Sequence, residues 1–286
     1  MATKENEYIL TVASATDMRI VPDITNLMNA NSCHITELAQ YEDKRSGRLF
    51  LRVVFAQSDM QRVAEVNRDL KDMANKYAMK VSLISRDETP RIILMVSHLD
   101  HCFRDLINRS QSGALNVSIV SAISNHETCR DVAQKSGIPY HYMPTQEFNQ
   151  AYREEKLKEI FEETRADLVV LARYMQVLSA SLCEYLYGRA INIHHSFLPA
   201  FKGARPYEQA YARGVKLIGA TAHYVTQDLD EGPIIEQVVR RVSHADGPHD
   251  LAVTGRDSER VALAKAIRLH VDRRVFIDGN KTILFH

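Results

Sequence analysis

The sequence carries no net charge, because 36 lysines and arginines balance 36 aspartates and glutamates. The isoelectric point near 7.2 leaves no basic field that would attract a phosphate backbone. We therefore expect no nucleic-acid partner. Hydrophobic residues make up 45% of the 286 residues, which is enough to build a core in each of two ordinary domains.

Long apolar runs are also missing. No stretch approaches the roughly 20 apolar residues that a helix needs to cross a bilayer. The start of the chain, Met1 to Glu7, is too polar to form the apolar part of a secretory leader. These features predict a cytoplasmic protein with no membrane partner.

Cysteine is scarce and scattered. The chain has four cysteines, and none of them forms a C-x-x-C pair: Cys33, Cys102, Cys129 and Cys183. Neither a disulfide framework nor a thiolate metal site is indicated. Buried free thiols are the simpler interpretation.

Residues 8–85 predict a small sheet with two helices on one face. The hydrophobic pattern indicates the order strand, helix, strand, strand, helix, strand. The expected strands are 8–13, 34–41, 49–56 and 80–85. A first helix carries Ile24, Leu27 and Met28, and a second follows the stripe Met60, Val63, Val66, Leu70, Met73 and Tyr77. Ser58 and Gln61 are expected to cap the second helix. The result is a ferredoxin-like βαββαβ domain.

A charged stretch containing a proline, residues 85–91, marks the expected domain boundary. We place the first domain at residues 1–86 and the second at 87–286. In the second domain strands alternate with helices, with strands expected at 92–96, 117–123, 168–172 and 190–195. Such alternation predicts a doubly wound α/β domain with a mostly parallel sheet, whose binding sites lie beyond the carboxyl ends of the strands.

The expected strand 190–195 holds a polar pair. Alternate side chains point to opposite faces of a strand, so Asn192 and His194 share one face and His195 takes the other. His194 and His195 are then poorly placed to share a metal ion, and Ser196 is poorly placed for a serine triad. Taken alone, the pair fits a hydrogen-bonded core pair as well as a catalytic one.

A carboxylate is expected in the same region. A returning strand over residues 217–226 leads into the loop 228–233, which presents Asp230. Loops that project from a rigid sheet often carry catalytic groups. Acyl transfer needs donors for an oxyanion and a base for the nucleophile, and an amide, an imidazole and a carboxylate supply both.

Three stretches together resemble the signature of the folate-dependent formyltransferases: Asn-Ile-His-His-Ser-Phe-Leu-Pro-Ala-Phe-Lys-Gly at 192–203, Gly-Ala-Thr-Ala-His-Tyr-Val at 219–225 and Leu-Asp-Glu-Gly-Pro-Ile-Ile at 229–235. The resemblance implies a catalytic set of Asn192, His194 and Asp230. It also implies that a strand-to-loop segment walls the pterin pocket and binds the substrate, through Tyr174, Met175, Gln176, Val177 and Leu178. Thr221 and His223 share a face of their strand and are expected to line the site in support.

Within this family the nearest resemblance is to the formyltetrahydrofolate deformylases, and it covers essentially the whole chain. The first domain resembles an ACT domain, the amino-acid-sensing module that deformylases place before the formyltransferase-like domain. Glycinamide ribonucleotide formyltransferases have a glycine-rich phosphate loop where residues 97–103 here read Ser-His-Leu-Asp-His-Cys-Phe, without glycine and with Asp100 to repel an anion. At position 195 the glycinamide ribonucleotide enzymes carry proline, whereas His195 here gives the sequence His-His-Ser-Phe-Leu-Pro that is typical of deformylases.

The resemblance therefore implies hydrolysis of 10-formyltetrahydrofolate to formate and tetrahydrofolate. Asp230 is expected to activate a water while protonated His194 and the Asn192 amide stabilise the oxyanion. Folate is the substrate, so neither a cofactor nor a metal is expected. The same resemblance implies a supply of formate for purine synthesis and a balance of one-carbon folate pools.

Other functions stay open at this point. A formyltransferase with another amine acceptor would transfer the formyl group in place of releasing formate. A methionyl-tRNA formyltransferase is disfavoured by the zero net charge and by the extra domain preceding the catalytic one. A non-catalytic amino-acid sensor is the binding-protein alternative, and the intact Asn192, His194 and Asp230 argue against it.

The sequence indicates a regulatory domain, but its expected effector loop departs from the family's pattern. ACT domains commonly pair edge to edge, so a homo-oligomer with glycine or methionine as effector is expected. The deformylase effector loop typically reads Asp-Arg-Pro-Gly, whereas residues 17–20 here read Asp-Met-Arg-Ile. Branched Ile20 resists the positive φ angles that glycine allows. We therefore expect weak or altered amino-acid control.

Overall fold

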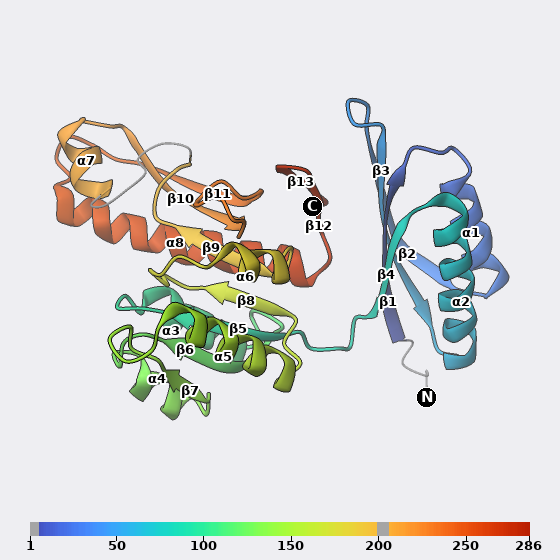
Figure 1. Ribbon diagram of the computed structural model, residues 1–286. Helices are drawn as coiled ribbons and strands as arrows, with labels where there is room; N and C mark the ends of the chain where they lie inside the picture. The colour runs from blue at the N-terminus through green and yellow to red at the C-terminus, as the bar shows by residue number, and fades with distance from the viewer. Residues whose placement is uncertain (1–5, 199–205) are drawn as a thin grey trace. The chain divides into compact units, whose positions relative to one another are not determined.

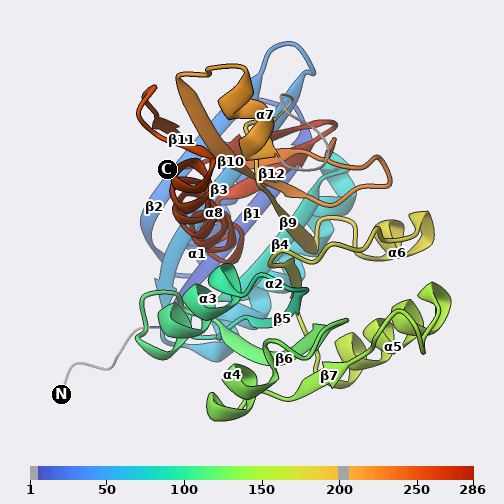
Figure 2. The same ribbon diagram turned by 90° about the vertical axis from the view of Figure 1, so that its left-hand side faces the viewer.

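The computed structural model describes residues 6–198 and 206–286, which form two compact units (Figures 1 and 2). The first unit holds the described residues up to Thr89 together with Arg273–Phe276 and Leu284–His286. The second unit holds the described residues of Pro90–Asp272 together with Ile277–Ile283.

The first unit is a four-stranded antiparallel sheet in the order β2-β3-β1-β4. Its strands are β1 Asn6–Ala15, β2 His34–Asp43, β3 Arg48–Gln57 and β4 Lys80–Ser85, and its helices are α1 Ile20–Ala30 and α2 Met60–Tyr77. Both helices lie on one face of the sheet (Figure 1). Every strand and helix predicted here is present, and the predicted βαββαβ arrangement is confirmed.

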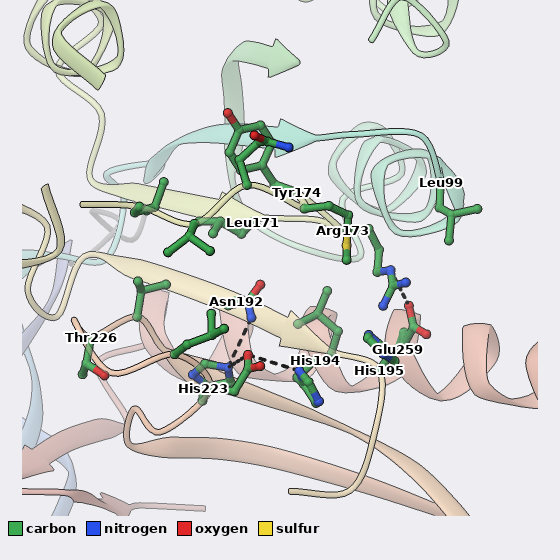
Figure 3. Close-up of a pocket in the computed structure, with 18 of the residues that line it drawn as sticks. Leu99, Leu171, Arg173, Tyr174, Asn192, His194, His195, His223, Thr226 and Glu259 are labelled. Atoms are coloured by element: carbon green, nitrogen blue, oxygen red, sulfur yellow. Dashed lines mark hydrogen bonds and ion pairs between the residues drawn. The ribbon is translucent and has the colours of Figure 1, made fainter. Parts of the chain in front are cut away.

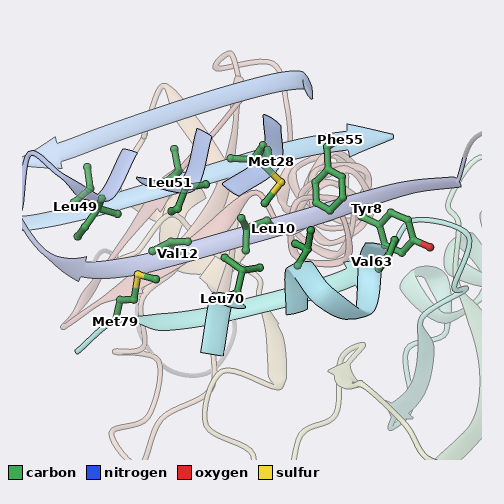
Figure 4. Close-up of a cluster of buried hydrophobic side chains, with 14 residues drawn as sticks. Tyr8, Leu10, Val12, Met28, Leu49, Leu51, Phe55, Val63, Leu70 and Met79 are labelled. Atoms are coloured by element: carbon green, nitrogen blue, oxygen red, sulfur yellow. The ribbon is translucent and has the colours of Figure 1, made fainter. Parts of the chain in front are cut away.

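The core of the first unit lies between the sheet and the two helices (Figure 4). Alternate side chains of β1 and β3 are buried on this face: Tyr8, Leu10, Val12, Leu49, Leu51, Val53 and Phe55. From α2, the buried residues are Val63, Val66 and Leu70. The hydrophobic periods of the sequence thus place inside most of the residues that the structure buries, but Met60, the first residue of the predicted stripe, is 63% exposed.

The cap of α2 differs from the prediction. Asp59 is the N-cap residue, and its side chain accepts a hydrogen bond from the Gln61 backbone N–H at 2.9 Å. The predicted capping box beginning at Ser58 is wrong, because the helix starts one residue later than that box requires. A carboxylate also suits the positive end of the helix dipole.

The end of the chain also departs from the prediction, which assigned it to the second domain. The division between the units falls after Thr89, within the expected linker, but parts of the last residues belong to the first unit. Arg274 pairs with Glu37 at 3.2 Å, and the rings of Phe276 and Phe50 lie 5.5 Å apart. Such long-range contacts leave no mark in the local hydrophobic pattern.

The second unit contains a seven-stranded sheet in the order β11-β10-β9-β8-β5-β6-β7. Its strands are β5 Arg91–Val96, β6 Ser118–Ser124, β7 Tyr140–Tyr142, β8 Leu168–Leu171, β9 Ala190–His194, β10 Leu217–Tyr224 and β11 Ile234–Arg241. Strands β5 to β9 pair in parallel, whereas β10 runs antiparallel to β9 and β11. The predicted mostly parallel α/β sheet is confirmed.

Helices connect and cover these strands: α3 His101–Gln111, α4 Arg130–Lys135, α5 Gln150–Glu163, α6 Ala180–Tyr185, α7 Pro206–Ala212 and α8 Pro248–Val271. The long helix α8 packs against β9, β10, β11 and α3. A short hairpin follows, β12 Val275–Asp278 with β13 Lys281–Leu284. Within the described ranges, no helix is long and apolar enough to cross a membrane.

The order of the second sheet creates a switch point. From β5 the chain runs outward to β6 and β7, and then returns to build β8 and β9 on the other side. The connections at the carboxyl ends of β5 and β8 therefore lead in opposite directions and leave a crevice between them. Open α/β sheets bind their ligands at such a crevice.

Candidate active site

A pocket of about 630 Å³ lies at the carboxyl ends of β8 and β9 in the second unit. Its wall is built from the segments that follow β5, β8, β9 and β10 and from one face of α8 (Figure 3). The three catalytic candidates and most of the predicted substrate-binding residues line it: Asn192, His194, Asp230, Tyr174, Met175, Gln176, Val177, Leu178 and His223. Residues far apart in the sequence therefore meet in one concave site.

Asn192 and His194 reach the pocket from β9, beside strand β10. The antiparallel register places Asn192 opposite His223 and His194 opposite Thr221. The Asn192 Nδ2 lies 3.2 Å from the His223 Nε2. The His223 Nδ1 donates to the carbonyl of Tyr224 at 2.8 Å, which fixes the ring with Nε2 toward the Asn192 amide. His223 thereby orients the Asn192 side chain.

Asp230 completes the group from the loop after β10. Its Oδ1 lies 3.1 Å from His194 Nδ1 and 3.7 Å from His223 Nε2. The backbone φ of Asp230 is +57°. This left-handed conformation is uncommon outside glycine, and such residues cluster at functional sites.

Gly232 explains how this loop closes. A Cβ at Gly232 would lie 1.8 Å from the carbonyl oxygen of Tyr224. Only glycine therefore allows the loop to return so closely to the end of β10, where Tyr224 N–H donates to the Pro233 carbonyl at 2.9 Å. The turn fixes the position of Asp230.

The charge of Asp230 is stabilised by its neighbours. Burial raises the pKa of the Asp230 carboxyl, but hydrogen bonds from His194 and His223 outweigh burial and hold that pKa well below its usual range. The side chain of Asp230 is only 16% exposed. The pocket therefore contains an ionised carboxylate that is largely shielded from water.

The second nitrogen of His194 is notable for lacking a partner. Its Nε2 is buried and has no hydrogen-bond partner among the residues that the structure describes. An unsatisfied buried polar atom costs about 1–3 kcal/mol, so native structures rarely keep one without a reason. Because Nδ1 is engaged by Asp230, Nε2 is the atom of His194 that a substrate can use.

His195 does not take the face predicted for it. β9 ends at His194, so the alternation of a regular strand does not extend to the next residue. The rings of His194 and His195 stack, with centroids 4.8 Å apart and 22° between their planes, and both line the pocket. The prediction that these two side chains point to opposite faces is therefore wrong.

The segment Tyr174–Leu178 lines the pocket along its whole length. Met175 and Val177 are 60% and 61% exposed, so the wall presents apolar side chains, as a site for a flat apolar ring requires. The hydroxyl of Ser97, just after β5, accepts the Met175 N–H at 3.0 Å and donates to Asn125 at 2.6 Å. The wall is thereby anchored to the end of β5.

Thr221 has a different position from the one predicted. It is fully buried and is not among the described residues that line the pocket. Its hydroxyl donates to the Ser196 carbonyl at 3.0 Å and accepts from the Leu198 N–H and the Gln237 amide, both at 3.1 Å. Thr221 therefore holds the chain that follows β9. The next residues of the signature, 199–203, lie outside the described residues.

A second polar group in the pocket was missed by the sequence reasoning. Glu259 of α8 is 1% exposed and has three partners. Its Oε2 lies 2.7 Å from His101 Nε2 and 3.5 Å from Arg173 Nε, and its Oε1 accepts from the Tyr207 hydroxyl at 3.0 Å. Burial raises the pKa of Glu259, but these partners hold it below its usual value. Glu259 stands between Ser258 and Arg260 in a polar run of the sequence, so no local signal marks its burial.

This group has only a partial likeness to a metal site. His101, Cys102 and Glu259 bring three possible ligand atoms within 4.8 Å of one another. Burial raises the pKa of the Cys102 thiol well above its usual value, so the thiol keeps its proton. The guanidinium of Arg173 already supplies positive charge to Glu259. These residues suit a hydrogen-bonded network better than a cation.

Hydrogen-bond donors and a carboxylate thus meet at this edge of an α/β sheet, and residues 90–267 match the model of the formyl transferase family. A formyltetrahydrofolate deformylase of Corynebacterium sp. (strain P-1) is 44% identical over 283 residues, which cover 99% of each chain. The deformylase of Bacillus subtilis (strain 168) is 42% identical and covers 99% of this chain and 95% of its own. The chain therefore belongs to the formyltetrahydrofolate deformylase family, as the sequence predicts.

Solved structures agree with this assignment. The crystal structure of a formyltetrahydrofolate deformylase from Burkholderia mallei ATCC 23344 matches with a TM-score of 0.95 at 43% identity, over 98% of this chain and 100% of that one. A glycinamide ribonucleotide transformylase 1 from Symbiobacterium toebii matches at 28% identity with a TM-score of 0.67. This match includes 98% of the transformylase chain but only 72% of the present chain, so the deformylase structure accounts for more of the molecule.

Proposed function

We propose that this chain hydrolyses 10-formyltetrahydrofolate to formate and tetrahydrofolate, in the pocket that contains Asn192, His194 and Asp230. The observation that carries the proposal is the buried His194 Nε2, which has no partner among the described residues and shares this pocket with an ionised carboxylate. Two hydrogen-bond donors and one carboxylate are sufficient for adding water to a formyl carbon.

In the proposed first step, Asp230 orients a water molecule and takes its proton while the water oxygen bonds to the formyl carbon. The formyl oxygen becomes an oxyanion and accepts hydrogen bonds from the Asn192 amide and from His194 Nε2. This step requires a proton on both nitrogens of His194, because Nδ1 faces Asp230 at 3.1 Å. Preorganised donors of this kind stabilise charge where it develops.

In the second step the tetrahedral intermediate collapses. The bond between the formyl carbon and N10 breaks, and the electron pair stays on N10, which takes the proton held by Asp230. Since its pKa lies well below the usual range, Asp230 is a weak base and releases that proton readily. N10 is conjugated to an aryl ring, so it leaves more easily than an alkylamine, and no cofactor is required.

The folate ring is proposed to bind along the segment Tyr174–Leu178. This segment supplies apolar side chains and backbone groups on one side of the pocket. The loop that carries Asp230 adds the apolar side chain of Leu229, which is 64% exposed. A flat ring between apolar walls, oriented by a few polar groups, is typical of small-molecule sites. The formyl group would then point toward His194.

The test of the function is a product balance. Purified protein is incubated with 10-formyltetrahydrofolate, and formate and tetrahydrofolate are measured with and without added amines. We expect equal amounts of the two products, independent of the amine. Transfer of the formyl group to an amine as the main reaction would support the transferase alternative, and absence of any turnover would support the non-catalytic sensor.

Chelators are predicted to leave the activity unchanged. The proposed steps use only Asn192, His194 and Asp230, and the network around Glu259 disfavours a cation. The measurement is formate release before and after exhaustive dialysis against a strong chelator. Inactivation that zinc reverses would contradict this prediction and indicate a metal in the reaction.

We further propose that the reaction takes place in the cytoplasm and supplies formate for purine synthesis while balancing one-carbon folate pools. The cysteines Cys33, Cys102, Cys129 and Cys183 are all free. Free thiols suit a reducing compartment. The zero net charge is also in keeping with a small-molecule substrate in place of a nucleic acid.

For regulation we propose a homo-oligomer formed through the ACT-like first unit, with weak control by glycine or methionine. The outer strands of its sheet are β2 and β4. Outer strands have unpaired backbone groups along one edge, through which sheets of two subunits can pair. Asp17 is engaged by Arg19 at 2.6 Å, and the Ile20 side chain is fully buried at the start of α1. Asp17 also accepts from the backbone N–H groups of Arg19 and Ile20, at 2.9 and 3.2 Å, so this loop offers an amino-acid carboxylate few backbone amides.

Titration of the protein with glycine and methionine is predicted to show binding weaker than micromolar and little change in rate. The physical reason is Ile20, which replaces the conformational freedom of a glycine with a buried, branched side chain. Calorimetry measures the binding, and formate release in the same buffer measures the response. Micromolar binding with a several-fold rate change would show that Ile20 does not disable the effector loop.

A further inference from the structure

Arg173 has a backbone conformation that favours glycine. Its φ is +66°, in the left-handed region that is unfavourable for a residue with a Cβ. The carbonyl of Arg173 accepts the Ser97 N–H at 3.2 Å, and the side chain is only 10% exposed. Strained backbone at a pocket wall points to a purpose for the side chain that occupies it.

Arg173 follows β8, the strand next to β9, which carries two of the catalytic candidates. Strands β8 and β9 are parallel neighbours, and Leu171 pairs with Asn192. Arg173 lies two residues past the end of β8, and His194 is the last residue of β9. Both residues line the same pocket (Figure 3). The Arg173 side chain is therefore part of the same pocket lining as the catalytic candidates.

Glu259 holds the Arg173 side chain from α8. Its carboxylate lies 3.5 Å from Arg173 Nε and is itself fixed by His101 from α3 and Tyr207 from α7. Gly255 makes room for this arrangement, because a Cβ there would lie 2.0 Å from the Tyr207 hydroxyl oxygen. Residues of three helices, α3, α7 and α8, thus meet at the carboxylate that pairs with Arg173.

We propose that Arg173, held by Glu259, closes the side of the pocket from which an amine acceptor would approach the formyl carbon, so that water is the nucleophile that reaches it. A guanidinium occupies the volume of a small acceptor and repels protonated amines. Water is small enough to be held by Asp230 without that space. The inference rests on the proposed hydrolysis and makes Arg173 a specificity-determining residue for it.

Removing the arginine should open a second reaction. An amine nitrogen would form the new bond to the formyl carbon, the bond to N10 would break with its electron pair on N10, and the proton lost by the amine would pass to N10. The products are a formamide and tetrahydrofolate. The chemistry is the same addition and collapse with a different nucleophile, so no further reagent is needed.

The test uses Arg173→Gly, which suits the positive φ, with Arg165→Gly as its matched control. Arg165 also has a positive φ, of 48°, but it is exposed and is not among the residues that line the pocket. Each protein is given 10-formyltetrahydrofolate and glycinamide, a small primary amine. We expect the ratio of formylated amine to formate to rise by at least about tenfold in Arg173→Gly and to stay at the wild-type value in Arg165→Gly.

A second variant covers the case in which Arg173→Gly does not fold. Glu259→Gln keeps the shape of the side chain, removes its charge and releases Arg173, so it should raise the same ratio to a smaller extent. A wild-type ratio in every folded variant overturns the inference. Formate release by the wild-type protein without amine tests the proposed function separately, so the two ideas can fail independently.

Discussion

Replacing Asp230 by asparagine is expected to lower turnover by about a thousandfold while leaving the affinity for folate nearly unchanged. Asparagine keeps the shape of the side chain but cannot take a proton from water. It also removes the charge that accepts from His194 at 3.1 Å. Both losses act on the transition state and not on the bound substrate, so kcat should fall and KM should not.

Glu231→Gln is the control for this experiment. Glu231 is exposed, follows Asp230 in the same loop and is not among the described residues that line the pocket. Steady-state rates and folate binding are compared for the two variants and the wild type. A raised KM with near-normal kcat in Asp230→Asn would mean that the carboxylate binds substrate and does not activate water.

The fold of the first unit could be predicted almost completely because its signals are local. Period-two patterns mark its strands, and the stripe through Val63, Val66 and Leu70 marks α2. What the sequence did not reveal depends on distant parts of the chain. The pairing of Arg274 with Glu37 joins residues from opposite ends of the sequence, and no local pattern records it.

The active site divides in a similar way. Asn192, His194 and Asp230 stand in contiguous signature stretches, so their resemblance to a known family identified them together. Arg173 directly precedes the segment Tyr174–Leu178, but its pairing with Glu259 could not be predicted, because that contact exists only after β8 and α8 have packed into one domain. His195 was misplaced for a simpler reason: strand alternation was extended one residue past the true end of β9.

The second large effect is expected for His194→Ala. Loss of one oxyanion donor typically costs about 10²–10³ in rate, so turnover should fall by that amount while folate still binds. The control is His249→Ala, since His249 also lies beside an aspartate, Asp250 at 3.9 Å, but is 89% exposed. Near-normal turnover in His194→Ala would remove this residue from the proposed mechanism.

The same variant should also change the pH dependence. In the wild type, hydrogen bonds from His194 and His223 hold the pKa of Asp230 well below its usual range against the effect of burial. The ionised form is therefore kept, and activity that needs it is lost only when the pH falls through that low pKa. Without His194 the effect of burial is less opposed, so the pKa of Asp230 rises and the acid limb of the rate should move to higher pH. Profiles of kcat against pH for both proteins measure this shift. An acid limb that stays in place would show that His194 does not control the charge of Asp230.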